Sequence, residues 1–420
     1  MPESFMTAPT NPSWLEELAE LKPADPQFAV QAVDLLLAAA RNIGASDLHL
    51  QPTAGGLDVR WRIDGVLQRL STLPVQVAPN VIGRIKVLAE LLTYRTDLPQ
   101  EGRIRAPGDV EMRVSTFPTL FGEKAVIRLF AAAGNFQRPA DLGLPPEIGD
   151  TLCKLLRETS GAILVTGPAG SGKTTTLYAC LRELAASDVF AGGSGRCIAS
   201  LEDPIEVVVP GVAQSQVNPA AGFDLATGLR FLLRQDPEVI MVGEIRDRET
   251  AEVAFQAALT GHLVLSSFHA GSAAGAISRL ADMGIEPYLL RSGVLAIVSQ
   301  RLARRLCQCA QPTEDPDVLL GLPVLRACLP QGCPACAGTG YHGRLVLAEM
   351  LTPSHSELGR AILSRDDAAQ LELLAIQAGM VTRWQRACTA IESGQTSPAE
   401  VRRVLGFRES AECGMRNTEG

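Results

Sequence analysis

The 420-residue sequence lacks an apolar run long enough to cross a membrane, and only 5% of its residues are aromatic. A membrane-spanning helix needs roughly 20 consecutive apolar residues, so this lack excludes a chain that crosses the bilayer as a helix. The N-terminal region also lacks the basic and then apolar order of a secretory signal peptide. We therefore expect the protein to stay in the cytoplasm.

Basic residues are in the minority, because 38 Lys and Arg face 46 Asp and Glu and the net charge is −8. This balance disfavours a surface that coats nucleic acid. The densest basic cluster, Arg301, Arg304 and Arg305, is small, and a solvated helix face explains it at least as well as an anionic lipid or an acidic partner does. With 46% apolar and 20% charged residues, the chain is expected to form two or three globular domains.

The first part of the chain carries the patterns of a small α+β domain. A helix is predicted over Gln27–Asn42. Leu57–Ile63 alternates apolar with charged residues and is followed by Asp64 and Gly65, a pair typical of a tight two-residue hairpin turn. Further strands are predicted over Val110–Thr116 and Ala125–Phe130.

The later part shows short apolar runs between helical stretches, as at Ile163–Val165, Val239–Val242 and Leu263–Leu265. Continuous apolar strands between helices predict a mostly parallel sheet covered on both faces. We therefore expect an α/β fold in four parts: a flexible lead over 1–26, an N-terminal α+β domain over 27–132, a linker over 133–143 and a nucleotide-binding domain over 144–420.

A phosphate-binding pattern, Gly-Pro-Ala-Gly-Ser-Gly-Lys-Thr, follows the apolar run Ala162–Val165 with only Thr166 between them. Glycine is needed at its first and sixth positions because the backbone must turn tightly and approach the phosphates closely. Lys173 is expected to reach the β- and γ-phosphates and Thr174 to hold Mg²⁺. A glycine-rich turn that matches by chance is the alternative. The predicted nucleotide-binding residues are Gly167, Pro168, Ala169, Gly170, Ser171, Gly172, Lys173, Thr174 and Thr175.

Two predicted strands end in carboxylates. Glu202 follows one of them, shortly before Pro204 stops the strand, and would place acidic oxygens where Mg²⁺ or an attacking water can be held. A surface turn is the alternative interpretation of that segment. Glu244 ends the other strand and is our candidate to orient or deprotonate water. Gly243 stands where an acid usually precedes such a glutamate, which shifts Mg²⁺ coordination toward Thr174 and Glu202.

Two of the five histidines, His262 and His269, bracket a third predicted strand. A single histidine at a strand end is more often a satisfied core or edge residue than a catalytic one. The neighbouring Glu244 and phosphate loop favour a catalytic interpretation of this pair. We expect His269, at the carboxyl end, to approach the γ-phosphate or to relay its loss.

The ten cysteines divide into a cluster and single residues. Free cysteines in apolar segments behave as small buried hydrophobes. The single residues expected to do so are Cys153, Cys180, Cys197 and Cys388. The clustered ones are Cys307, Cys309, Cys328, Cys333 and Cys336. In a reducing compartment such a cluster indicates a metal site before it indicates disulfides.

Taken in order, these blocks resemble the secretion and pilus-assembly ATPases, the hexameric motors of type II secretion systems and type IV pili. The resemblance runs through almost everything from residue 27 onward. It includes Ala45–His49, Val59–Gly65, Pro99–Arg103, Arg113–Thr116, Gly122–Lys124, the phosphate loop, Glu202–Glu206, Leu232–Pro237, Gly243–Asp247 and Thr260–His269. It implies a RecA-like P-loop ATPase domain, a smaller PAS-like α+β domain, a tetracysteine insert over 300–345 and a helical region over 355–406.

The resemblance also implies roles for arginines of the first domain. Nucleotide would be held between the two domains, with Arg113 and Arg128 neutralising phosphate charge as arginine fingers and Arg103 as a further candidate. From the pattern alone these are solvated strand residues. A cation that is placed only when the domains close is suited to the γ-phosphate, which is the physical reason to assign them that role.

The cysteine insert departs from the family pattern of two Cys-x-x-Cys pairs that bind zinc. Cys333 and Cys336 keep that spacing, whereas Cys307 and Cys309 are one residue closer. Four thiolates can still close a tetrahedral zinc site, and Cys328 or His342 could substitute for one of them. An insert held by packing alone is the alternative. A short lead also replaces the additional N-terminal docking domain of many relatives, so we expect docking by another surface or a shorter branch of the family.

We therefore interpret the chain as a cytoplasmic ATP-hydrolysing motor, peripheral to the inner membrane through its partners, that uses ATP, Mg²⁺ and a structural Zn²⁺. A homo-hexamer would act on an inner-membrane platform protein to assemble pilin-like subunits, without stable binding to nucleic acid. The alternatives are a pilus-retraction motor, a non-hydrolysing nucleotide-gated scaffold and a nucleic-acid translocase.

Overall fold

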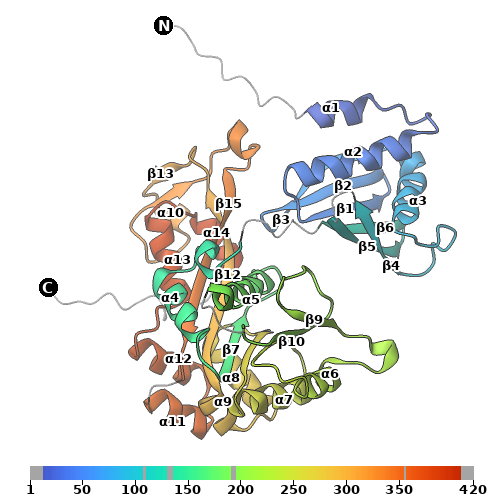
Figure 1. Ribbon diagram of the computed structural model, residues 1–420. Helices are drawn as coiled ribbons and strands as arrows, with labels where there is room; N and C mark the ends of the chain where they lie inside the picture. Colours follow the sequence, from blue (N-terminus) through green and yellow to red (C-terminus); the bar gives the residue numbers. More distant parts are fainter. Residues whose placement is uncertain (1–12, 107–109, 130–135, 191–194, 354–355, 408–420) are drawn as a thin grey trace. The chain divides into compact units, whose positions relative to one another are not determined.

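The computed structural model describes residues 13–106, 110–129, 136–190, 195–353 and 356–407. The chain divides into two compact units, Met1–Ala133 with Cys333–Gly338 and Gly134–Gly332 with Thr339–Gly420. Each unit contains one large β-sheet (Figure 1). Within the described ranges, no helix is both long and apolar enough to cross a membrane.

The first unit is a six-stranded antiparallel sheet with helices. Its elements are α1 (Ser13–Glu20), α2 (Phe28–Asn42), β1 (Asp47–Thr53), β2 (Gly56–Ile63), β3 (Val66–Leu73), η1 (Val75–Val77), α3 (Ala78–Leu88), β4 (Gln100–Ala106), β5 (Val110–Thr119) and β6 (Gly122–Leu129). The strand order is β3-β2-β1-β6-β5-β4. The predicted hairpin is confirmed, since Asp64 and Gly65 adopt φ angles of 47° and 81° between the paired residues Ile63 and Val66.

The strands of this sheet alternate between a buried and an open face. Leu48, Val59 and Ile127 pack with residues of α2 and α3 in one core cluster. The predicted helix over Gln27–Asn42 is confirmed as α2, which ends before Gly44 with φ of 72°. Residues on the other face of the strands are mostly polar, and arginines are prominent among them.

The second unit is built on a seven-stranded sheet of order β15-β12-β7-β11-β10-β8-β9. Its first half contains η2 (Pro139–Leu142), α4 (Pro146–Leu155), β7 (Gly161–Thr166), α5 (Lys173–Phe190), β8 (Ile198–Glu202), β9 (Ala213–Gln216), η3 (Pro219–Ala221), α6 (Leu225–Leu232), β10 (Val239–Ile245), α7 (Arg248–Leu259) and β11 (Leu263–Phe268). The second half contains α8 (Ala273–Asp282), α9 (Pro287–Gly293), β12 (Val294–Leu306), β13 (Gln311–Thr313), α10 (Pro316–Leu319), β14 (Ala327–Leu329), β15 (Tyr341–Leu351), α11 (Ser356–Ser364), α12 (Ala368–Gln377), α13 (Arg383–Glu392) and α14 (Pro398–Leu405). The short helix η4 (Pro334–Cys336) belongs to the segment Cys333–Gly338, which is grouped with the first unit.

The predicted α/β architecture is confirmed, because the pairs among β12, β7, β11, β10, β8 and β9 are parallel and only β15 pairs antiparallel. Successive residues of one strand enter different cores. Leu164 and Val242 pack with α7, α8 and α9, whereas Val165 and Met241 pack with α4 and α5. Both faces are therefore covered, which explains why these strands are apolar throughout.

Three local expectations are wrong. Arg301, Arg304 and Arg305 lie on strand β12 rather than on a helix face, and Arg304 forms an ion pair of 2.8 Å with the buried Glu400. Cys197 is exposed rather than buried, because it stands just before β8. Strand β6 begins at Gly122, three residues before the predicted start, since its hairpin turn is only two residues long.

Candidate functional site

The phosphate loop joins the carboxyl end of β7 to the first residue of α5. Gly167 has φ of 150°, and a Cβ on it would lie 2.4 Å from Ser171 Oγ and 2.5 Å from the carbonyl oxygen of Gln300. Gly172 has φ of 88°, and a Cβ on it would lie 3.1 Å from Gln300 Nε2. Only glycine fits these two positions, so the loop has the backbone that a phosphate-binding loop needs.

Lys173 is the first residue of α5 and folds back over this loop. Its Nζ donates hydrogen bonds to the carbonyl oxygens of Gly167, at 2.9 Å, and Pro168, at 3.0 Å. Burial lowers the pKa of Lys173, and the negative charge of Glu244 partly offsets that lowering. The next residue, Thr174, is exposed at the N-terminus of the helix, where the dipole favours anions.

Glu244 lies near the carboxyl end of β10, and both its oxygens have partners. Its Oε1 is 2.8 Å from His269 Nε2, and its Oε2 accepts a hydrogen bond of 2.8 Å from Arg246 Nε. The pairing of β10 with β11 shifts at Gly243, whose carbonyl oxygen accepts a bond of 2.7 Å from Ser267 Oγ. This irregularity and these partners hold the Glu244 carboxylate in one orientation.

The two histidines of the predicted pair lie at opposite ends of the same strand, β11. His269 follows the carboxyl end of β11, beside Glu244. His262 precedes the strand, and its Nδ1 lies 3.0 Å from the carbonyl oxygen of Ala257. A strand rises about 3.3 Å per residue, so this strand separates the two histidines by roughly 20 Å. The fold brings His269 to Glu244 and does not bring His262 there.

Glu202 ends β8 at the same edge, but it is only 3% exposed. Its carboxylate accepts hydrogen bonds from the Tyr178 hydroxyl, from Ser200 Oγ at 2.5 Å and from Gln214 Nε2 at 3.0 Å. The Tyr178 hydroxyl also accepts the backbone N–H of Glu206 at 3.1 Å. Burial, and then the Glu202 carboxylate, raise the pKa of Tyr178. Glu202 therefore ties α5 to the segment after β8.

Sequence reasoning missed two buried residues of this edge. Tyr178 lies on the apolar face of α5 and looks like an ordinary core residue in the sequence. Gln300 lies on β12 and bonds the loop from a position 129 residues away from Ser171. One feature of the sequence could have indicated Gln300: it stands inside a mostly apolar strand, and a buried glutamine must find hydrogen-bond partners.

The arginines predicted to act on the phosphates form a row across the sheet of the first unit. In the register of neighbouring strands, Arg103 stands opposite Arg113, Arg113 opposite Arg128, Arg128 opposite Asp47 and Asp47 opposite Arg62. Asp47 is buried and accepts Arg128 Nε at 3.1 Å and Arg62 Nε at 3.4 Å. The row thus places four arginines and one carboxylate side by side on one face of the sheet.

The expected cysteine cluster is confirmed as an arrangement of four side chains. The sulfur atoms of Cys307, Cys309, Cys333 and Cys336 all lie within 4.8 Å of one another. Cys333 Sγ and Cys336 Sγ are 3.7 Å apart. Two thiolates that bind the same tetrahedral zinc ion at about 2.3 Å lie roughly 3.8 Å apart. Neither Cys328 nor His342 belongs to this group, so the shorter first pair completes it unaided.

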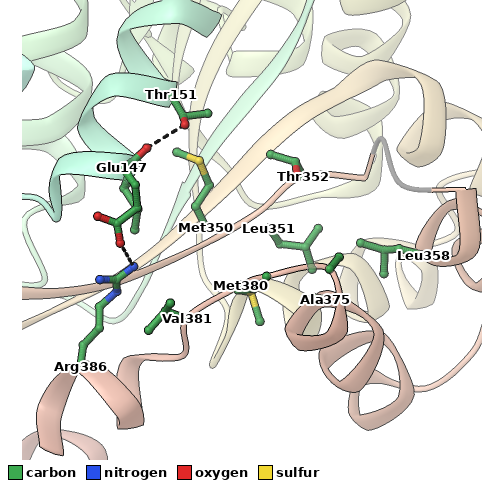
Figure 2. Close-up of a pocket in the computed structure, with 13 residues that line it drawn as sticks. Glu147, Thr151, Met350, Leu351, Thr352, Leu358, Ala375, Met380, Val381 and Arg386 are labelled. Carbon is green, nitrogen blue, oxygen red and sulfur yellow. Dashed lines mark hydrogen bonds and ion pairs between the residues drawn. The ribbon is translucent and has the colours of Figure 1, made fainter. Parts of the chain in front are cut away.

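A pocket of about 220 Å³ lies in the second unit, where α4, the end of β15 and the segment before α13 meet (Figure 2). Arg386 donates a hydrogen bond of 2.6 Å to Glu147, and Thr151 Oγ1 donates to the carbonyl oxygen of Glu147 at 2.7 Å. Met350 and Met380 are among the apolar lining residues. The pocket lining contains neither a histidine nor any residue of the phosphate loop.

The parallel sheet, the phosphate loop and the Glu244–His269 pair at one strand edge define a P-loop nucleotide-binding protein. Residues 22–403 match the family described as Type II/IV secretion system protein. The chain belongs to this family, the type II secretion and type IV pilus assembly ATPases.

Named relatives come from both branches. The chain is 40% identical over 403 residues to Type II secretion system protein E of Xanthomonas campestris, covering 93% of this chain and 69% of that one. It is 40% identical over 377 residues to Type II secretion system ATPase E of Vibrio cholerae, covering 84% and 73%. It is 39% identical over 379 residues to Type IV pilus assembly ATPase PilB of Thermus thermophilus, covering 87% of this chain but only 42% of that protein.

Solved structures share the fold at lower identity. The pilus retraction motor PilT with bound ADP is 24% identical, with a TM-score of 0.59, 90% of this chain and 97% of that chain being covered. The ATPase DotB of Legionella pneumophila is 21% identical with a TM-score of 0.63, covering 88% and 94%. At these identities the likeness concerns the fold alone.

Proposed function

We propose that this chain is an ATP-hydrolysing motor that powers the assembly of pilin-like subunits in a type II secretion or type IV pilus system. The observation that carries the proposal is the Glu244 carboxylate, held 2.8 Å from His269 at the sheet edge that also bears the phosphate loop. Phosphoryl transfer asks the protein mainly for positioning and charge stabilisation, and this edge supplies a fixed carboxylate, a lysine and a helix N-terminus.

In this proposal the residues of the edge divide the work. Lys173 would contact the β- and γ-phosphates of ATP in place of its loop carbonyls, and the exposed hydroxyl of Thr174 would help to hold Mg²⁺. Glu244 orients the attacking water, with His269 on its other side. Because three donors occupy the Glu202 carboxylate, Glu202 acts by positioning Tyr178 and the following segment.

We propose further that Arg113 and Arg128, with Arg103 beside them, neutralise phosphate charge during hydrolysis. Their side-by-side position in one row supports this role, since adjacent arginines can together stabilise the charge that develops on a transferring phosphate. Asp47 would then position Arg128 for its task.

The proposed machine is a homo-hexamer at the cytoplasmic side of the inner membrane, where a platform protein receives the motion. The names of the relatives, a type IV pilus assembly ATPase and a type II secretion system protein, support partners within a secretion or pilus apparatus. The net charge of −8 favours protein partners over stable nucleic-acid binding.

We also propose that Cys307, Cys309, Cys333 and Cys336 bind one structural Zn²⁺, which would close the insert by linking its two ends. Elemental analysis of the purified chain should find about one zinc per chain. Cys336→Ser should lose the metal and lower the melting temperature, whereas Cys328→Ser, outside the cluster, should keep the metal. Equal zinc content in both variants would contradict the site.

The central experiment compares hydrolysis of Mg²⁺-ATP by the full chain and by its Glu244→Gln variant. Loss of the carboxylate should lower kcat about 100-fold or more while ATP binding remains. Glu252→Gln, on the exposed side of α7, is the matched control and should hydrolyse ATP at the normal rate. No hydrolysis by the unmodified chain above the level of Glu244→Gln would overturn the proposal.

A further inference from the structure

Gln300 lies on β12 immediately beyond the level at which its neighbour β7 ends. Ser299 pairs with Thr166, the last residue of β7, so Gln300 stands opposite the first residue of the phosphate loop. Its side chain is 1% exposed. A buried amide at this point must satisfy both its N–H groups and its oxygen from within the protein.

The amide of Gln300 joins the loop to the helix that follows it. Its Nε2 donates a hydrogen bond of 2.8 Å to the carbonyl oxygen of Ser171, and its Oε1 accepts one of 3.1 Å from Thr176 Oγ1. Only the amide nitrogen can donate to a carbonyl, so the Ser171 contact determines which way the amide is turned. The backbone oxygen of Gln300 also lies so close to Gly167 that a Cβ there would be 2.5 Å from it.

These bonds bear on the part of the loop that faces phosphate. In a planar trans peptide the C=O of one residue and the N–H of the next point in opposite directions. Gln300 holds the C=O of Ser171 toward β12, so the N–H of Gly172 must point away from β12. Backbone N–H groups turned outward in this way are the groups with which a phosphate loop binds its ligand.

A neighbouring arginine joins the same strand to the catalytic edge. Arg301 donates from one guanidinium nitrogen to the Gln300 carbonyl oxygen at 3.1 Å and from another to that of Gly271 at 3.0 Å. Gly271 follows His269 by two residues. Strand β12 is thus bonded both to the phosphate loop and to the segment that carries His269.

We propose that Gln300 is a positioning residue for nucleotide binding, which keeps the Gly172 N–H directed at the phosphates by holding the Ser171 carbonyl. The inference rests on the proposed ATPase function. Because the loop contacts phosphate before and during hydrolysis, loss of this hold should weaken binding in both states and raise KM more than it lowers kcat.

The test uses the full chain with Gln300→Met, which keeps the length of the side chain and removes its donor and acceptor. The KM for Mg²⁺-ATP and the Kd for ADP should each rise about tenfold, as expected when a buried hydrogen-bond partner is left unsatisfied. Thr176→Val removes only the second bond and should have a smaller effect. Ser299→Ala is the matched control, because Ser299 Oγ is buried and has no partner among the described residues.

Unchanged KM and Kd in a folded Gln300→Met protein would overturn the inference, whatever its melting temperature. If that variant does not fold, Gln300→Glu serves instead, since its carboxylate can accept from Thr176 but cannot donate to Ser171. A tenfold loss of affinity supports the inference, and normal affinity overturns it. An unmodified chain that binds no ATP would instead defeat the proposed function, which separates the two failures.

Discussion

The phosphate-loop edge of the second unit and the arginine row of the first unit both gather charge, but they hold it differently. At the edge, Lys173 rests on two backbone carbonyls and Glu244 lies between His269 and Arg246. In the row, Asp47 is the single carboxylate among four arginines. The lysine and the glutamate of the edge each contact groups of opposite charge or polarity, whereas the row places four arginines beside one carboxylate.

The largest effect that tests this contrast is expected from the row. Arg128→Ala or Arg113→Ala should lower kcat for ATP about 10³-fold, because a cation placed at the transferring phosphate acts mainly in the transition state. Steady-state hydrolysis and a separate measurement of nucleotide Kd should show that affinity changes far less than turnover.

Arg60→Ala is the control for both variants, since Arg60 lies on the same face of the sheet but outside the row and pairs with Asp58 at 2.9 Å. It should leave kcat unchanged. If all three variants hydrolyse ATP alike, the row is a structural feature, and the contrast with the phosphate-loop edge disappears.

A smaller effect is expected from the carboxylate that holds the row. Asp47→Asn should lower kcat about tenfold, because Arg128 loses the charge that orients it. Asp58→Asn is matched to it in burial and in having two arginine partners, yet it lies outside the row. Equal losses of turnover in the two variants would show that any buried acid on this face affects hydrolysis through stability alone.

The smallest effect concerns the lysine at the edge. Burial lowers the pKa of Lys173, so the folded state holds its proton less tightly than the unfolded state does. The charge therefore opposes folding below the lowered pKa, and this opposition fades as pH rises toward 10.5, the usual value. The melting temperature of Lys173→Met minus that of the unmodified chain should therefore fall by about 1–2 °C between pH 7 and pH 10.

The exposed Lys154 provides the control for this measurement through Lys154→Met. A difference in melting temperature that stays constant with pH, or that moves in favour of Lys173→Met at high pH, would contradict the expected sign. The burial of the charged Lys173 side chain would then not lower the free energy of unfolding.

Much of the fold and part of the candidate site were predictable because their signals are local. The hairpin at Asp64 and Gly65 depends on two adjacent residues, and the phosphate loop depends on eight contiguous ones. Glu244 and His269 were predictable as a pair because parallel strands bring their carboxyl ends to one edge.

Other features were not predictable from local patterns. His262 and His269 were predicted to act together because they flank the same short strand in the sequence. In the structure they lie at opposite ends of β11, so only His269 is at the carboxyl end beside Glu244. The enclosure of Glu202 depends on Tyr178 and Gln214, which approach it from other elements. The strand position of Arg301 was missed, since Arg301, Arg304 and Arg305 are spaced i, i+3 and i+4, as residues on one face of a helix are.

The sequence by itself determined that this chain carries a glycine-rich loop of the phosphate-binding pattern, two closely spaced pairs of cysteines, and strands that alternate with helices, because each of those properties follows from residues that are neighbours in the chain. Only the tertiary structure decided that Gln300 holds Ser171 from 129 residues away and that Arg103, Arg113 and Arg128 stand side by side. The physical reason is that register between strands is set by burial of whole faces, which no single segment encodes.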